Sequence, residues 1–357
     1  MFLKNSDAIP LVIDTDNAFG MPVRDLDDGI ALIISLVSEQ IDVKGVVASA
    51  CNCRAHEAAQ NTLHLFEQFG ITHIPVGLGA ETPLSGNREA HHQYLDAKVQ
   101  GKGAVYWNDA PVVPSRNVSA LPNGVDVLID AVRANPHEIV LVALGSFTNI
   151  ALALRKAPDI VPMVREIVHM GGSFEPQEGE MRFDWDTPDI PKEVWDTTLR
   201  FNTWYDKQAT AEVLQSGIPV CFITANVTSN FYLQNTQVEQ LCDNAKGELG
   251  SYLMRLILPW QKWSIAERKL AGAHMHDPLT ILALLDRSVC TYRYMKADVL
   301  GFLAGYELFP QNESRLWKTC QNTFIPKVKV ATNLRTARAE QLLQDLLLRA
   351  VTLESNE

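Results

Sequence analysis

The sequence predicts an α/β fold in which a mostly parallel central sheet is flanked by helices. Short apolar runs alternate with stretches of helical spacing, and polar residues follow directly after the apolar runs. This alternation is typical of strand–helix–strand units, which build a parallel sheet with helices on both faces. The chain has 357 residues, of which 46% are hydrophobic, so it can bury a large core. Because it contains no repeat, linker or low-complexity segment, we expect a single domain over residues 1–357.

The spacing of apolar residues predicts the elements in order along the chain. Short apolar runs predict buried strands at residues 11–13, 43–48, 139–143, 166–170 and 219–223. Helical spacing predicts the intervening helices at residues 29–37, 55–69, 125–134, 149–156 and 209–215.

The C-terminal part continues this pattern less regularly. Residues 249–269 have helical spacing but contain Pro259, which predicts a kinked helix or two shorter helices. A last strand is expected at residues 328–331 and a last helix at residues 336–353. Two segments without such patterns, 80–118 and 173–191, are predicted loops. Loops of this length are uncommon unless they cover a site or carry short helices.

Charge and composition exclude several classes of function. The formal net charge of -11 and the pI of about 5.3 have the wrong sign for binding a polyphosphate backbone through Lys and Arg. The sequence has no run of about 18 apolar residues that would span a bilayer, and residues 1–10 lack the apolar stretch of a secretory signal. We therefore expect a cytoplasmic protein that binds a small molecule, with no nucleic-acid or membrane partner.

The six cysteines support a reducing compartment. Only Cys51 and Cys53 lie close together, and their spacing lacks the two-residue gap that is usual in zinc and thioredoxin-like sites. Free thiols are the simpler interpretation.

A dense group of carboxylates lies between the first predicted strand and the first predicted helix: Asp14, Asp16, Asp25, Asp27 and Asp28. Packing so many carboxylates together is costly unless a cation or protons neutralise them, and Ca²⁺ or Mg²⁺ is the simplest cation for oxygen ligands. The alternative is that Asp27 or Asp28 caps the helix while the other carboxylates are solvated. A strand followed by Asp14 and Asp16 also resembles the start of haloacid dehalogenase-type phosphatases.

The remaining motifs resemble those of the inosine-uridine preferring nucleoside hydrolases. The opening motif of that family, Asp-Thr-Asp-x-x-x-Asp-Asp, is matched at its two ends by residues 14–16 and 27–28. The later motifs are matched in order by Cys51-Asn52, by residues 144–151, by Phe201-Asn202 with Asp206, and by His276-Asp277-Pro278. Five motifs in order, spread between residues 11 and 278, extend this resemblance over most of the chain.

This resemblance implies an open sheet of the nucleoside hydrolase type and a Ca²⁺-dependent N-ribosyl hydrolase that acts in nucleoside salvage. It implies that Asp16, Asp28 and Asp277 bind the ion through their side chains, and Thr148 through its main-chain carbonyl. It implies Asp16 as the general base and His276 as an acid near the leaving base. The residues that it assigns to the sugar are Asp27, Asn52, Asn202 and Asp277. Relatives are commonly homodimers or homotetramers.

The chemistry explains why such residues are needed. Cleavage of an N-ribosidic bond passes through a sugar with oxocarbenium character, so the site must hold the ribose, activate a water and stabilise the departing base. A metal ion with an adjacent carboxylate suits the water, and a histidine suits the base because its pKa lies near neutrality.

Simpler interpretations stay open for several of these residues. His276 can be a buried or helix-terminal histidine, and Thr148 and Asn149 can cap the helix that they begin. Trp260 and Trp263 lie on one helix face and are better candidates for the core than for a base-stacking platform. Tyr252, Trp185 and Trp204 are further candidates for lining the base pocket.

The chain departs from the family pattern at two places. Arg200 replaces the glutamate that usually accepts a hydrogen bond from the ribose 5'-hydroxyl, and a guanidinium cannot accept one. Residues 17–26 also lengthen the segment between the first aspartates, and this insertion carries Phe19, Met21 and Arg24. Both changes suggest a substrate whose 5' end differs from that of an ordinary nucleoside, such as one with a 5'-phosphate. The alternative for Arg200 is a salt bridge with the acidic segment 173–191.

Three hypotheses about function follow. The first is hydrolysis of the N-ribosidic bond of a nucleoside or related ribosyl compound. The second is a ribosyl-ligand binding protein that keeps the calcium site without turnover, and the third is a phosphatase built on Asp14 and Asp16. The phosphatase leaves Thr148 and Asp277 unexplained.

Overall fold

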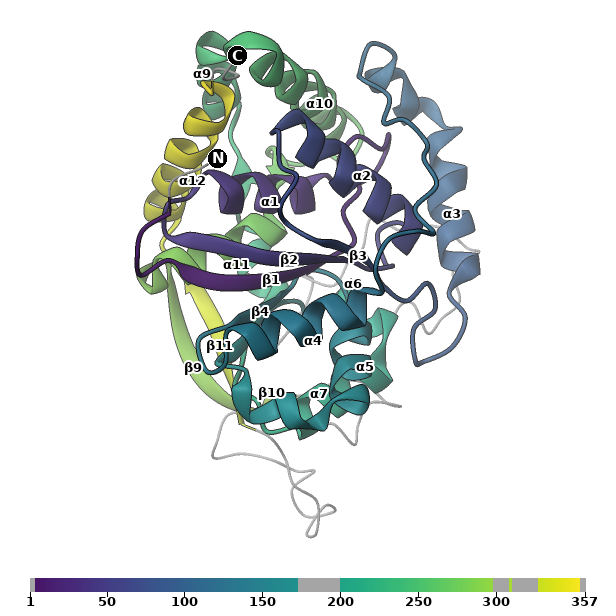
Figure 1. Ribbon diagram of the computed structural model, residues 1–357. Coiled ribbons are helices and arrows are strands. Elements are labelled where there is room, and N and C mark those ends of the chain that lie inside the picture. The colour runs from purple at the N-terminus through teal and green to yellow at the C-terminus, as the bar shows by residue number, and fades with distance from the viewer. Residues whose placement is uncertain (1–3, 173–199, 298–307, 310–326, 354–357) are drawn as a thin grey trace.

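The computed structural model describes residues 4–172, 200–297, 308–309 and 327–353, and its central feature is one large sheet (Figure 1). Among these residues, nine strands form that sheet in the order β10-β9-β11-β6-β5-β4-β1-β2-β3. Their bounds are β1 Ile9–Thr15, β2 Ile41–Ala48, β3 Val76–Leu78, β4 Val140–Ala143, β5 Glu166–Met170, β6 Val220–Ile223, β9 Cys290–Ala297, β10 Leu308–Phe309 and β11 Lys327–Leu334. A separate pair joins β7 Tyr232–Leu233 to β8 Ala273–His274.

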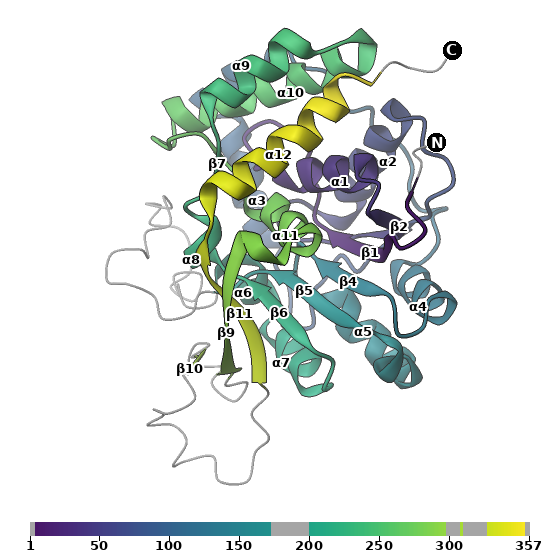
Figure 2. The ribbon, with the colours of Figure 1, turned by 90° about the vertical axis from the view of Figure 1, so that its left-hand side faces the viewer.

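Helices cover both faces of the sheet (Figures 1 and 2). The α-helices are α1 Asp27–Val37, α2 Ala55–Gln68, α3 Glu89–Val99, α4 Gly124–Ala134, α5 Thr148–Lys156, α6 Arg200–Tyr205, α7 Lys207–Gln215, α8 Ala225–Thr228, α9 Asn235–Asn244, α10 Gly247–Ala266, α11 His276–Leu285 and α12 Thr336–Val351. The described 3₁₀ helices are η1 Lys102–Trp107, η2 Pro158–Met163 and η4 Arg287–Val289. On one face lie α1 and α11 with α10 and α12 outside them, and on the other lie α4, α5 and α7.

Alternate residues of each central strand explain why two layers of helices are needed. In β1, Leu11 and Ile13 belong to the core cluster under α1 and α11, whereas Val12 belongs to the cluster under α4 and α5. Strand side chains point alternately to opposite faces, so apolar residues at successive positions require both faces to be covered. This is why the central strands appear as continuous apolar runs in the sequence.

The predicted parallel sheet is confirmed. Strands β1 to β6 and β11 pair in parallel, and the predicted strands and helices of the N-terminal two thirds all occur close to their predicted bounds. The prediction of two shorter helices over residues 249–269 is wrong, because one helix, α10, continues through the buried Pro259. The predicted loop 80–118 carries α3 and η1, and the predicted loop 173–191 lies outside the described residues.

The pattern of apolar residues missed the antiparallel edge of the sheet. Strand β9 pairs antiparallel with both β11 and β10. Its sequence contains Tyr292, Arg293 and Tyr294 in place of an apolar run, and Tyr294 is 59% exposed. Among the described residues only the two-residue strand β10 lies beyond β9, so β9 is close to the edge of the sheet and buries less surface than a central strand, which weakens its apolar pattern. Helix α11 was missed for the opposite reason, since nearly all of its residues are buried and it shows no polar face.

The insertion at residues 17–26 is packed into the fold. The Phe19 ring is 1% exposed and lies against Gly29 of α1, where a Cβ atom would come within 2.3 Å of the ring. Arg24 is 3% exposed and donates hydrogen bonds to the carbonyl oxygens of Leu95 (2.6 Å) and Asn52 (3.2 Å). Both side chains are thus used for packing and hydrogen bonding within the protein. They attach the insertion to α1 and α3.

Replacing Phe19 with Ala should destabilise the protein by about 3–5 kcal/mol, the usual cost of removing a buried phenylalanine ring. Gly29→Ala should also destabilise wild type, because its methyl group would overlap the ring, but should be tolerated better in the Phe19→Ala background. Urea unfolding of the two single variants and the double variant measures this coupling. Val112→Ala, at a side chain that is 85% exposed, is the control. Additive effects of Phe19→Ala and Gly29→Ala would contradict the packing described.

Candidate active site

Polar residues gather where the central parallel strands end. Strand β1 pairs with β2 and β4 on its two sides, so the residues after these three strands meet at one edge of the sheet. Ligands of open α/β sheets bind at this carboxyl edge. Gly145, which follows β4, lies so close to Asp16 that a Cβ atom would be 2.8 Å from Asp16 Oδ1. The missing side chain allows the Asp16 carboxylate to lie against this turn.

Three buried carboxylates form the centre of the site. Asp27 and Asp28 are the first two residues of α1, and Asp277 lies in the first turn of α11. Ligand atoms of these three residues all lie within 4.8 Å of one another. The Asp277 N–H donates to Asp27 Oδ2 at 3.1 Å, and Thr15 Oγ1 donates to Asp28 Oδ1 at 2.5 Å. The packing of α1 against α11 therefore brings together residues 250 positions apart in the sequence.

The charges of this group are poorly compensated by the protein. Burial raises the pKa of Asp27 to about 7, and burial together with neighbouring carboxylates raises the pKa of Asp28 and of Asp277 well above the usual range. Burial also raises the pKa of Asp16, which lies within hydrogen-bonding reach of Asp28. Asp277 Oδ1 is buried and has no hydrogen-bond partner among the described residues. Oxygen ligands with this surplus of negative charge fit a hard divalent cation.

The helix-capping alternative for this group is wrong. The N-cap position of α1 is occupied by Leu26, and no side chain caps that helix. Asp27 and Asp28 instead lie inside the first turn, where the positive end of the helix dipole favours negative charge.

Asp14 does not have the position that a phosphatase nucleophile needs. Its side chain is 1% exposed and faces Ser49 and Asn149, although neither carboxylate oxygen makes a well-formed hydrogen bond within the described part of the chain. Burial raises the pKa of Asp14 to about 7. Because the neighbours of this carboxyl group, Ser49 and Asn149, are themselves fully buried, its position does not support the phosphatase hypothesis.

Asn52 joins Asp16 to the insertion. The Asn52 main-chain N–H donates to Asp16 Oδ2 at 2.6 Å, and its side-chain Nδ2 donates to the carbonyl oxygen of Asp25 at 2.9 Å. The loop after β2 is held on its other side by His91 of α3, whose Nε2 lies 3.1 Å from the carbonyl oxygen of Cys51. Asn52 is 8% exposed, so it lies at the inner wall of the site.

Asn202 lies across the ends of β4 and β5. Its Nδ2 donates to the carbonyl oxygens of Leu144 and Met170, the latter at 3.0 Å, and its Oδ1 is 3.5 Å from the Cys51 thiol. The preceding residue, Phe201, has a positive φ of 21° inside α6. A non-glycine residue in that region is uncommon and such strain occurs preferentially at functional sites.

Asp206 fixes the side chain of Thr148. Asp206 matched a family motif in the sequence, but no role was predicted for it. Thr148 Oγ1 donates to Asp206 Oδ2 at 2.7 Å, and the N-cap of α5 is Phe147, so Thr148 does not cap that helix. The fully buried Asp206 carboxylate also accepts hydrogen bonds from Leu84 N, Ser85 N, Ser85 Oγ and Ala209 N. These bonds hold the loop before α3 and the start of α7 beside Thr148. The sequence could not show them because the partners lie in a segment without a pattern.

His276 begins α11 directly before Asp277. Its Nδ1 lies 2.7 Å from Thr228 Oγ1, and its ring stacks on His274 with a centroid distance of 4.5 Å. The His274 ring in turn lies 4.4 Å from the Tyr232 ring. These contacts fix the orientation of a half-buried imidazole at the edge of the carboxylate group.

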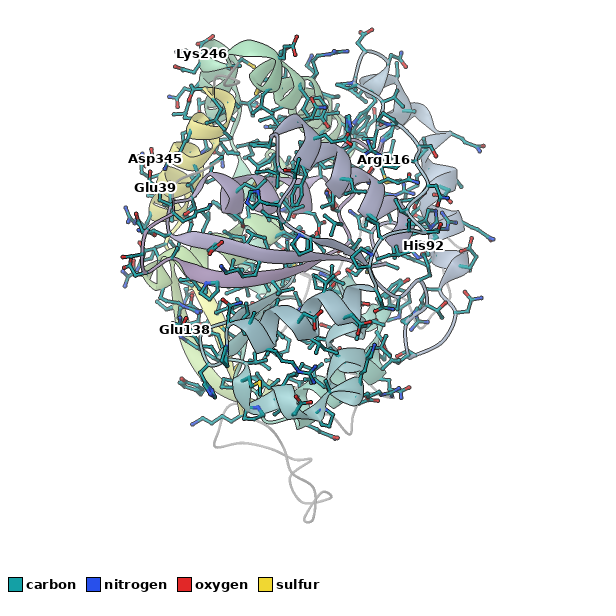
Figure 3. The ribbon with its side chains drawn as sticks, in the orientation of Figure 1. Glu39, His92, Arg116, Glu138, Lys246 and Asp345 are labelled. Atoms are coloured by element: carbon teal, nitrogen blue, oxygen red, sulfur yellow. The ribbon has the colours of Figure 1, made fainter. Side chains whose placement is uncertain are left out.

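Helix α3 forms a wall beyond the ends of β1 and β2 (Figure 3). His91 and His92 of this helix are buried against α6, with His92 Nε2 3.0 Å from Tyr205 Oη. Burial lowers the pKa of His91 to about 3 and that of His92 to about 4, so both imidazoles are neutral near pH 7. The sequence missed this wall because it lies in the segment predicted as a loop.

The aromatic residues considered for the base pocket lie mostly in the core or against neighbouring helices. Trp260 and Trp263 are 0% and 9% exposed and belong to the core, as expected. Trp204 is buried against Arg88 and His91, and Tyr252 packs against His64. Arg200 is the first residue of α6, but its side chain lies outside the described part of the structure, and so does Trp185.

The helices provide no candidate for a membrane span: among the described residues, none is long and apolar enough.

Comparison with known proteins identifies the family. The model of the inosine-uridine preferring nucleoside hydrolases matches residues 11–340. The probable uridine nucleosidase 2 of Arabidopsis thaliana is 26% identical over 344 residues, which cover 96% of this chain and 98% of the relative. The pyrimidine-specific ribonucleoside hydrolase RihA of Salmonella arizonae is 28% identical over 290 residues, which cover 80% of this chain and 82% of the relative.

Solved structures agree with this assignment. The plant nucleoside hydrolase PpNRh1 has a TM-score of 0.75 and 26% identity, with 95% of this chain and 99% of that chain covered. A purine-preferring ribonucleoside hydrolase from Gardnerella vaginalis shares the fold with a TM-score of 0.73 at 21% identity, over 97% of this chain and 100% of that one. The chain belongs to the inosine-uridine preferring nucleoside hydrolase family, and it is a nucleoside hydrolase that cleaves an N-ribosidic bond to give a free base and ribose.

Proposed function

We propose that this nucleoside hydrolase depends on one Ca²⁺ ion bound at the carboxylate group, and that Asp16 and His276 act on opposite sides of the scissile bond. The observation that carries the proposal is the convergence of Asp27, Asp28 and Asp277 at the carboxyl edge of the sheet, with Asp16 beside them. Buried carboxylates at such short range are stable together only when protons or a cation compensate them.

The ligands proposed for the ion are Asp16, Asp28 and Asp277 through their carboxylates and Thr148 through its carbonyl oxygen. The unpartnered Asp277 Oδ1 supports this set. Asp27 lies in the same group of oxygen atoms, and we assign it to a ribose hydroxyl because its Oδ2 is already engaged by Asp277 N–H. When bound, the ion supplies positive charge that offsets the carboxylates and polarises the oxygen atoms it contacts.

The residues around the ion divide the remaining tasks. Asp16, whose second oxygen is held by Asn52 N–H, accepts the proton of the attacking water. Asn52, Asn202 and Asp277 hold the ribose. His276, oriented by Thr228, transfers a proton to the departing base, whose negative charge would otherwise make it a poor leaving group.

The substrate that we propose to assay first is uridine. Relatives of this chain carry the names uridine nucleosidase and pyrimidine-specific ribonucleoside hydrolase. A cytoplasmic location, a role in salvage and a homodimer or homotetramer stay predictions.

In the absence of divalent ions, the free energy of unfolding should fall as the pH rises. In the unfolded chain an aspartate loses its proton at about pH 4. In the folded protein, a carboxyl group with a raised pKa keeps its proton until the pH reaches that raised value. Stability therefore falls across that window. For Asp27, whose raised pKa is about 7, the loss should be complete above pH 7. Thermal unfolding in EDTA at pH 5 and pH 8 measures the effect.

Calcium should reverse this loss at pH 8. At about 100 times the Kd, a ligand stabilises the folded state by about 2.7 kcal/mol, or roughly 4 °C for a chain of this size. Asp28→Asn should weaken the response to calcium and abolish turnover, whereas Asp159→Asn, at an exposed ion pair with Arg133, should leave both unchanged. An unfolding midpoint that calcium does not move would contradict the proposed ion site.

His276→Ala should reduce turnover more for nucleosides than for an activated substrate such as a nitrophenyl riboside. A general acid contributes about 10² to 10⁴-fold, and it matters most when the leaving group is basic. The measurement is kcat for uridine and for the nitrophenyl riboside, with His137→Ala as a control at an exposed histidine. Equal losses for both substrates would show that His276 only positions the base.

Arg200 gives a test of the 5' end of the substrate. If Arg200 replaces the acceptor for the ribose 5'-hydroxyl, its guanidinium can bind phosphate oxygens in pairs. Wild type should then hydrolyse uridine 5'-monophosphate with a higher kcat/KM than uridine, and Arg200→Glu should reverse this order. A wild-type preference for uridine would reject the phosphate and leave a salt bridge as the role of Arg200.

A further inference from the structure

The insertion at residues 17–26 places a carboxylate outside the group of metal ligands. Asp25 Oδ1 forms an ion pair with Arg268 Nη1 and accepts a hydrogen bond from Trp260 Nε1 at 3.4 Å. Arg268 follows the end of α10 and lies 243 positions later in the sequence. The side chains are 31% and 23% exposed, so this pair can be reached from solvent.

The ion pair leaves hydrogen-bonding groups unused on both partners. Both contacts of the Asp25 carboxylate are made by Oδ1, and no described residue donates to Oδ2. Arg268 makes its hydrogen bond through Nη1 and its guanidinium lies over the Trp263 ring, 5.2 Å from the ring centroid, while among the described residues Nη2 and Nε have no acceptor. Since Oδ1 and Nη1 are in contact, the unused acceptor and donors lie on neighbouring groups. The Asp25 acceptor and the Arg268 donors together match a ligand that has an N–H donor next to an oxygen acceptor.

The pair lies between the sugar side and the base side of the site. The carbonyl oxygen of Asp25 accepts a hydrogen bond from Asn52 Nδ2 at 2.9 Å. On the other side, the Asp25 carboxylate interacts electrostatically with His276 and His274. The ion pair with Arg268 favours the charged, hydrogen-bond-accepting form of this carboxylate.

The backbone on both sides is held in an uncommon conformation. Val23, two residues before Asp25, has a φ of 58°, and Lys269, directly after Arg268, has a φ of 59°. Positive φ is unfavourable for a non-glycine residue, above all for a β-branched one such as Val23. Residues retained in this region must be fixed by their surroundings, so the two segments that carry the pair are held in place.

We propose that Asp25 and Arg268 are specificity-determining residues that bind the edge of the nucleobase. Arg268 donates to a carbonyl oxygen of the base, and Asp25 accepts from the neighbouring ring N–H. The edge of uracil that carries N3–H and that of hypoxanthine that carries N1–H both have this form. The inference rests on the proposed position of His276 at the base.

N-methylated substrates test the proposal in wild type without any substitution. Methylation of N3 in uridine or of N1 in inosine removes the donor and leaves the ribosidic bond unchanged. Because a site that hydrogen-bonds its substrate rejects an analogue lacking the bond, kcat/KM should fall about tenfold or more for 3-methyluridine and 1-methylinosine. Equal kcat/KM for methylated and parent nucleosides would overturn the inference.

Substitutions then assign the effect to the pair. Asp25→Asn and Arg268→Gln should each lower kcat/KM for uridine and inosine by about 10 to 100-fold and remove most of the discrimination against methylated substrates. A nitrophenyl riboside, which has no such edge, should be hydrolysed within about threefold of wild type, since binding of the base edge does not contribute to it.

The matched control is Arg287→Gln. Arg287 forms an ion pair with Glu166, with side-chain exposures of 32% and 18%, at the opposite end of β5 from the site. This variant should keep wild-type selectivity. If Asp25→Asn and Arg268→Gln lower kcat/KM equally for all substrates, the nitrophenyl riboside included, the ion pair is structural and the inference is overturned. If wild type releases ribose equally well from methylated and parent nucleosides, only this inference is refuted. If no substrate releases ribose in the presence of calcium, both the proposed function and this inference are refuted.

Discussion

Repulsion among buried carboxylates is the constraint on which the site depends. Asp27 and Asp28 at the start of α1 and Asp277 at the start of α11 have to be held together against their own charges. The dipoles of both helices point their positive ends at this group, which offsets part of the repulsion. The packing of α1 on α11 through buried apolar residues such as Ile30 and Leu279 supplies the rest of the restraint. The unsatisfied charge that remains explains why a divalent cation fits here.

Two buried polar residues connect the long loops to this centre. Arg24 binds main-chain oxygens of α3 and of the loop after β2, and Asp206 accepts from the loop before α3 and from Thr148. Main-chain groups in loops have no regular partners, so burying them requires side chains that satisfy them. In this protein an arginine satisfies carbonyl oxygens and an aspartate satisfies N–H groups. The loop before α3 and α3 itself are therefore fixed as a wall of the site.

The site has a side rich in carboxylates and amides and a side rich in aromatic rings. The first is formed by the ends of β1, β2 and β4 with the starts of α1 and α11. The second is formed by Tyr232, His274 and His276, with the Asp25–Arg268 pair near the two imidazoles. The insertion joins the two sides, because Asp25 contacts Asn52 through its main chain and Arg268 through its side chain.

By itself the sequence determined the parallel sheet, the family and most members of the carboxylate group. Apolar periodicity records which faces an element buries, and the motifs stand directly after the strands whose ends meet at one edge. It did not show that Asp27 lies in the same group of ligand atoms as Asp28 and Asp277, that β9 and β10 form an antiparallel edge, or that α3 walls the site. Nor did it show the bonds of Asp206 or the pairing of Asp25 with Arg268. Only the tertiary structure decided these contacts, because they join residues far apart in the chain whose meeting depends on helix packing and loop paths, which leave no periodic trace in the sequence.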